Sequence, residues 1–408
     1  NNNPTGINQY KECPPKGDIH IAEILRDCHR QGWGRTRISD FLEKTHKVKM
    51  SPTTVQRRMT ALGLFGSSVA TARLPDEVKM QLILDQMARD PLSRQGPNSV
   101  KEGILFDTGI KLTREYTRNA MHLQDPTGAA ACEPTAKKVH KAQLVALGPH
   151  HEWSADGHDK LSALGFPIWG IRDKWTGQWL CLRVVPNNRL RDSMAYLYLE
   201  VIHELGGMPL QMTTDCGIET TVIYGLASAL RDTFSPELPR DELPAHRFLR
   251  SIHNITIERG WAQLRIKWVD NMKTFWEGGA SLYHPEVVRE YNLVMWLWPK
   301  LLQQELDYWC SRQNVHKIRF DKEKKLPSGD SPNTFMADYP KYHGEWCLQA
   351  VDKETIAKLM DALGGEDLVK FIPDKEFNQA QEIYNGLGAP KLTYDNIWNV
   401  YMSMLPFM

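Results

Sequence analysis

The chain has 408 residues, of which 41% are hydrophobic and 24% charged, a composition typical of a folded protein with two to four domains. Its formal net charge is only +1, so no overall field draws it to a polyanion, and any affinity for nucleic acid must come from local basic patches. No stretch approaches the roughly 18 uninterrupted apolar residues that suggest a membrane span, so no membrane partner is expected. The seven cysteines form no Cys-x-x-Cys pair, which favours reduced thiols inside a cell over a disulfide scaffold.

The N-terminal region is expected to be helical. Residues 1–16 are polar and proline-containing, and we expect a flexible arm there. Residues 17–68 predict three short helices, and the third has the clearest start, because Ser51 is a good N-cap and Pro52 suits the first helical turn. Four polar side chains are left on the outer face of this third helix: Thr54, Gln56, Arg57 and Arg58. The pattern is typical of a helix-turn-helix module that binds DNA, although a small helical bundle with a solvated face fits it too.

A weaker second copy of this module is expected in residues 74–126. Its segment Lys111–Met121 echoes Lys49–Met59 and follows two further expected helices. Arg114 and Arg118 are its candidate DNA contacts. Two modules in tandem would let one protein bridge a longer DNA site than either module reads alone.

A basic linker is expected in residues 127–149. Lys137 and Lys138 lie on a short basic helix within it. Most such runs are only solvated faces. Between a DNA-binding region and a catalytic core, however, these two lysines are candidates for contact with a phosphate backbone.

Residues 150–340 change to a pattern of strands and helices. Three strands, a helix, a fourth strand and another helix are expected, at residues up to 156, 166–171, 179–185, 191–205, 210–214 and from 220 onward. The first three form a predicted antiparallel meander. This order is typical of a ribonuclease-H-like α/β fold, a mixed five-stranded sheet flanked by helices. Residues 341–408 predict short amphipathic helices and are expected to form a small C-terminal appendage, for which the sequence suggests no function.

Three acidic residues stand where a rigid scaffold would hold them. Asp156 and Asp215 each end a run expected to be a strand, and Glu258 lies at an expected helix start. Three converging carboxylates are what two magnesium ions need to clamp the attacking and leaving oxygens of a phosphodiester. The alternative for each acid taken alone is a surface carboxylate or a helix cap.

The sequence around these acids carries recognisable segments. They are Trp-x-x-Asp-Gly at Trp153–Gly157, Gly-x-x-Asp at Gly170–Asp173, Asp-x-Gly-x-Glu at Asp215–Glu219, and His-Asn-x-x-Ile-Glu-Arg-x-Trp at His253–Trp261. Together these segments resemble the integrase-core proteins of the DDE superfamily, which are related to retroviral integrases and many transposases. The nearest likeness is to a transposon-derived eukaryotic group found often in fungi. The resemblance covers residues 150–335 best.

The resemblance implies a catalytic role. Asp156, Asp215 and Glu258 would be the catalytic residues and would hold two Mg²⁺ or Mn²⁺ ions for DNA strand cleavage and strand transfer. The implied partners are double-stranded DNA, as element ends and target, and further copies of the chain in a homodimer or larger oligomer. The implied location is the nucleus. Two alternatives remain: a domesticated DNA-binding protein with this fold and no transposition activity, and a hydrolytic ribonuclease-H-like nuclease.

Three further residues are candidates for supporting roles. Asn254 would orient the metal site or cap the helix, and Glu219 would support Asp215. Arg265 lies two turns beyond Glu258 and is a candidate for a phosphate contact. The sequence lacks the His and Cys pattern of the retroviral zinc module, so zinc is not expected.

Overall fold

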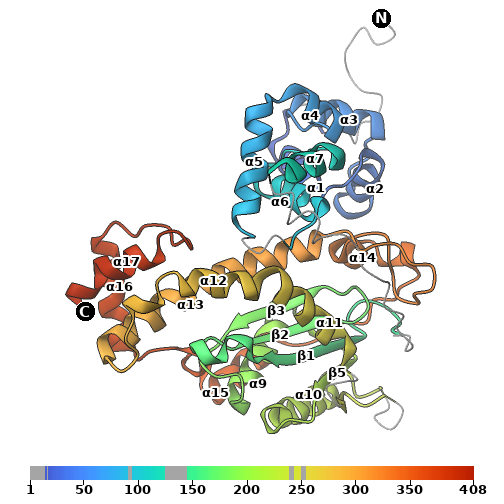
Figure 1. Ribbon diagram of the computed structural model, residues 1–408. Coiled ribbons are helices and arrows are strands. Elements are labelled where there is room, and N and C mark those ends of the chain that lie inside the picture. Colours follow the sequence, from blue (N-terminus) through green and yellow to red (C-terminus); the bar gives the residue numbers. More distant parts are fainter. Residues whose placement is uncertain (1–13, 16, 91–93, 125–144, 239–242, 250–253) are drawn as a thin grey trace, which may run out of the picture. The chain divides into compact units, whose positions relative to one another are not determined.

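A computed structural model describes residues 14–15, 17–90, 94–124, 145–238, 243–249 and 254–408. The chain divides into two compact units, Asn1–Lys137 and Lys138–Met408. The described part of the first unit is helical, and the second combines a mixed sheet with helices (Figure 1). No helix in these described ranges is long and apolar enough to cross a membrane.

The first unit contains the helices that the apolar spacing predicts, together with a short one that it does not. The described helices are α1 (Ile19–Arg30), α2 (Arg35–His46), α3 (Pro52–Ala61), α4 (Ser67–Arg73), α5 (Asp76–Ala88), α6 (Pro97–Thr108) and α7 (Arg114–Gln124). Helix α3 begins as expected, because the Ser51 hydroxyl accepts a hydrogen bond from the backbone N–H of Thr54. Helix α4 was not expected from the sequence. It begins after Gly66, which makes no side-chain cap.

Two small hydrophobic cores stabilise the first unit. Helices α1 to α3 enclose one around Leu25, Ile38 and Val55, and helices α5 to α7 enclose the other around Ile83 and Ile104. Burial of these apolar side chains provides most of the stability of such short helices.

The two helical cores are joined by a buried histidine. The Nε2 atom of His29, on α1, lies 2.9 Å from the backbone carbonyl of Gly109, which ends α6. A carbonyl oxygen only accepts hydrogen bonds, so Nε2 carries the proton and donates it. Burial, and secondarily the positive charge of Lys111, lowers the pKa of His29 to about 4. His29 is therefore neutral in the folded protein at pH 7.

We expect the junction at His29 to weaken in mild acid. The pKa of His29 lies below the ordinary 6.5, so unfolding takes up a proton, and stability is lost as the pH falls from about 6.5 toward 4. The loss approaches about 1.4 kcal/mol per pH unit for one proton. Replacing His29 with glutamine places an amide N–H near Nε2 and cannot titrate, so this variant should lose less stability. Hydrogen exchange of α1 and α6 peptides in urea at pH 7 and pH 5 measures it. Equal pH dependence in both proteins would contradict this role of His29.

The second unit is built on a five-stranded mixed sheet in the order β3-β2-β1-β5-β6. The strands are β1 (Glu152–His158), β2 (Ile168–Asp173), β3 (Trp179–Val184), β5 (Gln211–Asp215) and β6 (His246–Leu249). Strands β1, β2 and β3 form the predicted antiparallel meander, while β5 is parallel to both β1 and β6. The ribonuclease-H-like architecture predicted from the sequence is confirmed.

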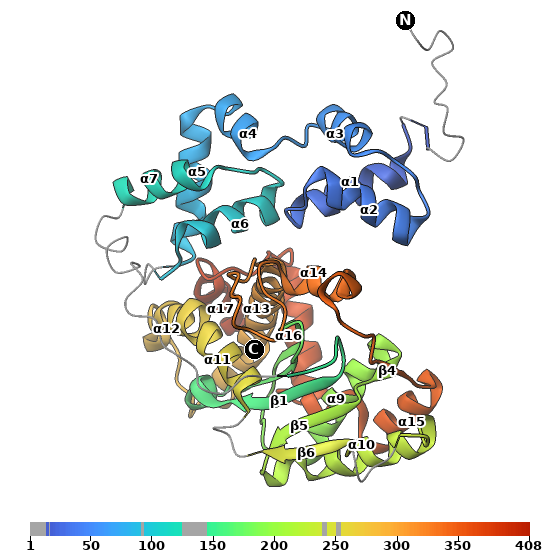
Figure 2. The same cartoon turned by 90° about the vertical axis from the view of Figure 1, so that its right-hand side faces the viewer.

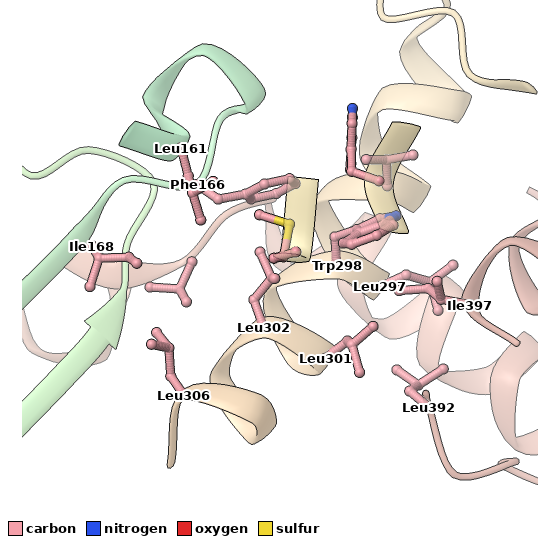
Figure 3. Packing of buried hydrophobic residues seen from close by; sticks show 14 of the residues in the cluster. Leu161, Phe166, Ile168, Leu297, Trp298, Leu301, Leu302, Leu306, Leu392 and Ile397 are labelled. Carbon is pink, nitrogen blue, oxygen red and sulfur yellow. The ribbon is translucent and has the colours of Figure 1, made fainter. Parts of the chain in front are cut away.

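Helices cover both faces of this sheet (Figure 2). On one face, α9 (Arg191–Leu205) and α10 (Thr221–Phe234) pack against Trp153 and Trp169, which point to that side from β1 and β2. The other face carries α11 (Ile255–Leu264), α12 (Asp270–Glu277) and the long α13 (Val288–Val315). Figure 3 shows that Trp298, Leu302 and other α13 residues lie in one hydrophobic cluster with Phe166 and with Ile168, the first residue of β2.

The C-terminal residues are helical, as expected, but they are not a separate appendage. Strand β7 (Gln349–Ala350) pairs with β4 (Gly207–Met208), and α15 (Lys353–Leu363) buries Ile356 in the core beside α9. The last helices, α16 (Asp374–Gly386) and α17 (Ile397–Met404), pack into the core around α13. The sequence shows that each helix has an apolar face, but it does not show which surface that face covers.

Candidate active site

The two aspartates lie side by side on adjacent inner strands of the sheet. Strands β1 and β5 run parallel, with Ser154 paired to Thr213, so Asp156 and Asp215 each follow two residues later. Side chains two residues apart point to the same face of a strand. The Thr213 hydroxyl donates a hydrogen bond of 3.1 Å to the Glu152 carboxylate. The face of β1 that carries Glu152 and Asp156 is therefore the face on which β5 carries Thr213 and Asp215. Asp156 and Asp215 are therefore neighbours on that face.

Helix α11 brings the third acid to the same region. This helix packs across β1 and β2, and Glu258 lies in its first turn with an exposed side chain. The pKa of Asp156 rises to about 7, mainly because the carboxylate is buried and then because Asp215 is negatively charged. The charge of Glu258 raises it further, while hydrogen bonds from Trp261 and Gly157 oppose the rise. The three acids therefore lie within electrostatic reach of one another.

The carboxylates do not close into a ligand cluster by themselves. Among the residues described, no group of three or more His, Cys, Asp or Glu side chains is arranged to hold a metal ion. The sheet thus positions the two aspartates, and Glu258 stays at the exposed surface of α11.

Asn254 contacts the site directly. Its side chain makes no hydrogen bond that caps α11, so the cap that the sequence allows is not formed. Its amide nitrogen lies 3.3 Å from Asp215 Oδ1 and 3.4 Å from the backbone carbonyl of Ala155. Its amide oxygen is buried and has no hydrogen-bond partner among the described residues. Asn254 therefore links α11 to both aspartate-bearing strands, and its neighbour His253 lies outside the described residues.

The turn after Asp215 is held by a threonine. The Thr220 hydroxyl donates to the backbone carbonyls of Asp215, at 3.1 Å, and Gly217, at 2.9 Å. The Glu219 carboxylate folds back over Gly217, where an added Cβ would lie only 2.1 Å from it. No hydrogen bond from Glu219 to Asp215 is observed among the described residues, so the expected support of Asp215 by Glu219 stays a prediction.

Two aromatic residues beside Asp156 had no role in the prediction. The indole Nε1 of Trp261 donates to Asp156 Oδ2 at 3.0 Å. The ring of His158 stacks on Trp261, with centroids 4.9 Å apart and planes 16° apart. Trp261 is the last residue of the segment His253–Trp261, which also contains Glu258. Its place in that segment was the signal available in the sequence.

A half-buried arginine that the sequence did not single out fixes α11 to the sheet. Arg172, on β2, donates from Nη1 to the Thr256 carbonyl and from Nε to the Gly177 carbonyl, both at 2.8 Å. One side chain thus ties the first turn of α11 to the β2–β3 turn.

Basic residues surround the far end of β1. Burial first, and then the positive charge of Lys160, lowers the pKa of His158 to about 4. Arg265 and Lys273 act in the same direction, so both lie near His158, two residues beyond Asp156. Arg265 is exposed and begins a π-helical turn, Arg265–Val269, between α11 and α12. Such turns are frequent at functional sites.

The DNA contacts predicted in the first unit differ in how available they are. Arg57, Arg114 and Arg118 are exposed. The guanidinium of Arg58 instead donates to the backbone carbonyls of Pro14 and Pro15, so it ties the preceding segment to α3.

The remaining predicted contacts are partly engaged. The Thr54 hydroxyl bonds the Ser51 hydroxyl at 3.0 Å, and the Gln56 amide reaches the Thr60 hydroxyl at 3.5 Å. Both contacts lie at the exposed surface, where a ligand can replace them. Lys137 and Lys138 of the predicted basic linker lie outside the described residues.

Comparison with known proteins is consistent with this geometry. Residues 145–329 match a family model described as an integrase core domain. The matched range contains strands β1 to β6 and all three acids. No curated protein matches the chain.

Proposed function

We propose that this protein, whose residues 145–329 match the family model of an integrase core domain, is a DDE-type DNA transposase or integrase that cleaves DNA strands and joins them to target DNA. In the first step, water would attack a phosphodiester and release a strand with a free 3′-hydroxyl. In the second, that hydroxyl would attack a target phosphodiester, forming one new P–O bond and breaking one. Neither step needs a covalent bond to the protein.

The observation that carries this proposal is the arrangement around Asp156. Asp215 on the neighbouring parallel strand and Glu258 on α11 both raise the pKa of Asp156, so negative charge is concentrated around Asp156. Carboxylate oxygens are the ligands that Mg²⁺ prefers, and the buried amide oxygen of Asn254, which has no hydrogen-bond partner among the described residues, belongs to a side chain in contact with Asp215. The residues therefore fit a divalent cation.

The three acids would hold two Mg²⁺ or Mn²⁺ ions, which when bound activate the attacking oxygen and stabilise the leaving one. The chain's own contribution is to fix the ligands. Parallel pairing sets the spacing of Asp156 and Asp215. Arg172 anchors the first turn of α11, from which Glu258 projects.

The proposal extends to the partners. Residues 17–68 and 74–126 would be tandem helix-turn-helix modules for double-stranded DNA, residues 127–149 a basic linker, and the protein would act in the nucleus. A homodimer or larger oligomer would process two DNA ends together. Arg265, beside the catalytic acids, would contact phosphate.

A strand-transfer assay tests the reaction. The full chain is incubated with Mg²⁺ or Mn²⁺, a labelled duplex with a free 3′-hydroxyl and a plasmid target, beside Asp215→Asn and Asp159→Asn variants. Asp159 is a matched control, because it lies close to Asp156 in sequence but pairs with Arg189 and Asn188. Joining that requires Asp215 and not Asp159 supports the proposal. Cutting without joining favours the nuclease, and binding of duplex with neither activity favours the domesticated DNA-binding protein.

DNA binding by α3 gives a separate prediction. Replacing the exposed Arg57 with alanine should weaken duplex binding uniformly across sequences and reduce the salt dependence by about one unit of slope, if one phosphate contact is lost. Arg26→Ala is the control, because Arg26 is exposed on α1 and not on the third helix. Fluorescence anisotropy at several salt concentrations measures both. An unchanged slope for Arg57→Ala would exclude this residue from the interface.

A further inference from the structure

Two hydrogen-bond donors reach the aspartates from a single helix. At the start of α11, the Asn254 amide lies 3.3 Å from Asp215 Oδ1. Two turns later, the Trp261 indole lies 3.0 Å from Asp156 Oδ2. Glu258 lies between these two donors in the sequence. One element therefore contacts both aspartates and carries the third acid. Figure 2 shows this helix, α11, beside β1.

The Trp261 indole is held tightly in place. It is only 4% exposed, stacks on His158, and packs against Trp179 with ring centroids 4.9 Å apart. Beneath it lies Gly170, the residue paired with Asp156 across β1 and β2. A Cβ at Gly170 would lie 2.7 Å from Trp261 Cη2, so the ring occupies space that only a glycine leaves open. The direction of its N–H is fixed by this packing.

The hydrogen bond to Asp156 is not a general requirement of tryptophan packing here. Five other buried tryptophans in the described part of the same unit have an indole N–H with no hydrogen-bond partner among the described residues: Trp169, Trp268, Trp296, Trp298 and Trp309. Core packing in this unit therefore tolerates an unpaired indole. Trp261 differs because its N–H meets a carboxylate of the candidate active site.

Both donors are neutral, and this matters for a metal ligand. A lysine or arginine in either place would pair ionically with the aspartate and compete with a cation. A neutral N–H orients the carboxylate and leaves its negative charge available. Such supporting hydrogen bonds commonly change metal affinity or activity by about 10-fold to 100-fold when they are removed.

We propose that Trp261 and Asn254 are positioning residues, which orient Asp156 and Asp215 respectively for divalent cations. This rests on the proposed function for the identity of the site, but it concerns cation binding and not the reaction. Neither residue touches DNA or the reacting atoms in this proposal. Each acts through the carboxylate that it contacts.

The test measures Mn²⁺ binding to the full chain without DNA. The electron paramagnetic resonance signal of the free ion reports how much Mn²⁺ remains unbound. Trp261→Phe keeps an aromatic ring for the stack and removes the N–H. We expect its Mn²⁺ dissociation constant to rise about 10-fold. Trp268→Phe is the matched control, because Trp268 is buried on the same helical run and its N–H has no partner. That variant should bind Mn²⁺ as the unaltered chain does.

A double-mutant cycle separates positioning from a general structural role. If Trp261 acts through Asp156, then Trp261→Phe should have no further effect on Mn²⁺ binding in an Asp156→Asn background. Asn254→Leu should likewise weaken binding in the unaltered chain and have little effect in an Asp215→Asn background. Circular dichroism melting confirms that each variant is folded.

The outcomes distinguish this proposal from the proposed function. Equal Mn²⁺ affinity in Trp261→Phe and Trp268→Phe would overturn the positioning role. Mn²⁺ affinity that does not change in Asp156→Asn would overturn it too. Mn²⁺ binding that depends on Asp156 and Trp261, in a protein that neither cuts nor joins DNA, would support positioning and contradict the proposed function.

Discussion

Replacing Asp156 with asparagine should make the folded protein more stable while removing the proposed strand-joining activity. The pKa of Asp156 is raised from 3.8 to about 7, first by burial and then by the charge of Asp215. An acid with a raised pKa in the folded state destabilises that state once it ionises, so its cost grows as the pH rises from about 4 to 7 and is constant above. Asparagine keeps an oxygen to accept the Trp261 N–H and carries no charge.

The expected gain is about 1–4 kcal/mol at pH 8, where Asp156 is ionised, and much less at pH 5, where the folded protein holds it protonated. Urea unfolding at the two pH values measures the difference. Mg²⁺ should stabilise the unaltered chain and not the variant, because a ligand stabilises only the state that binds it. Strand joining should fall about a thousand-fold or more, since a lost metal ligand removes several kcal/mol of transition-state stabilisation.

The control for this prediction is Asp159→Asn. Asp159 pairs with Arg189 at 2.5 Å, but both side chains are largely exposed, so the pair contributes at most about 1 kcal/mol. The control should lose a little stability and retain activity. If the gain in stability of Asp156→Asn over the unaltered chain were no larger at pH 8 than at pH 5, the pKa of Asp156 would not be raised in the folded protein.

The sheet and its acids could be predicted because their signals are local. The helix at Arg191–Leu205 follows from its apolar spacing and the glycine after it. Asp156 lies in β1 and Asp215 ends β5, and the segment around each is visible in the sequence. Parallel pairing of β1 and β5 then places the two acids together, as the connection through α9 requires.

The contacts around the acids could not be predicted, because they join distant residues. Trp261 is 105 positions from Asp156, and Arg172 is 84 positions from Thr256. A motif identifies such residues but does not say what each one touches. Asn254 shows the limit clearly: its position before a helix predicts a cap, whereas the neighbouring strands offer its amide other partners.

The outer face of α3 shows the same limit at the surface. Arg57 and Arg58 were both predicted on the outer face of α3, but of the two only Arg58 is bonded to the carbonyls of Pro14 and Pro15. The proline-containing segment before the first helix creates that difference. Exposure and existing partners therefore decide which basic side chains are available, and neither is readable from the spacing.

A methyl group added at Gly170, on the strand next to Asp156, should disrupt the candidate active site by displacing Trp261. The Cβ of Gly170→Ala would lie 2.7 Å from Trp261, 2.9 Å from Trp179 and 3.0 Å from Leu182, so buried side chains must shift. Overpacking of this kind costs about 1–3 kcal/mol. Because Trp261 is displaced, its hydrogen bond to Asp156 should lengthen, and Mn²⁺ affinity should fall together with stability.

The same substitution elsewhere should have the opposite sign. Gly225 is exposed on α10, and a Cβ there would meet no atom within 4 Å. Gly225→Ala should therefore stabilise the protein by about 0.5–1 kcal/mol, because alanine loses less backbone entropy in a helix. Urea unfolding of both variants, with Mn²⁺ titration, gives the comparison. Gly170→Ala could instead prove as stable as Gly225→Ala and bind Mn²⁺ normally. That result would mean that the Trp261 ring is not confined against β2 and that packing does not fix the direction of its N–H toward Asp156.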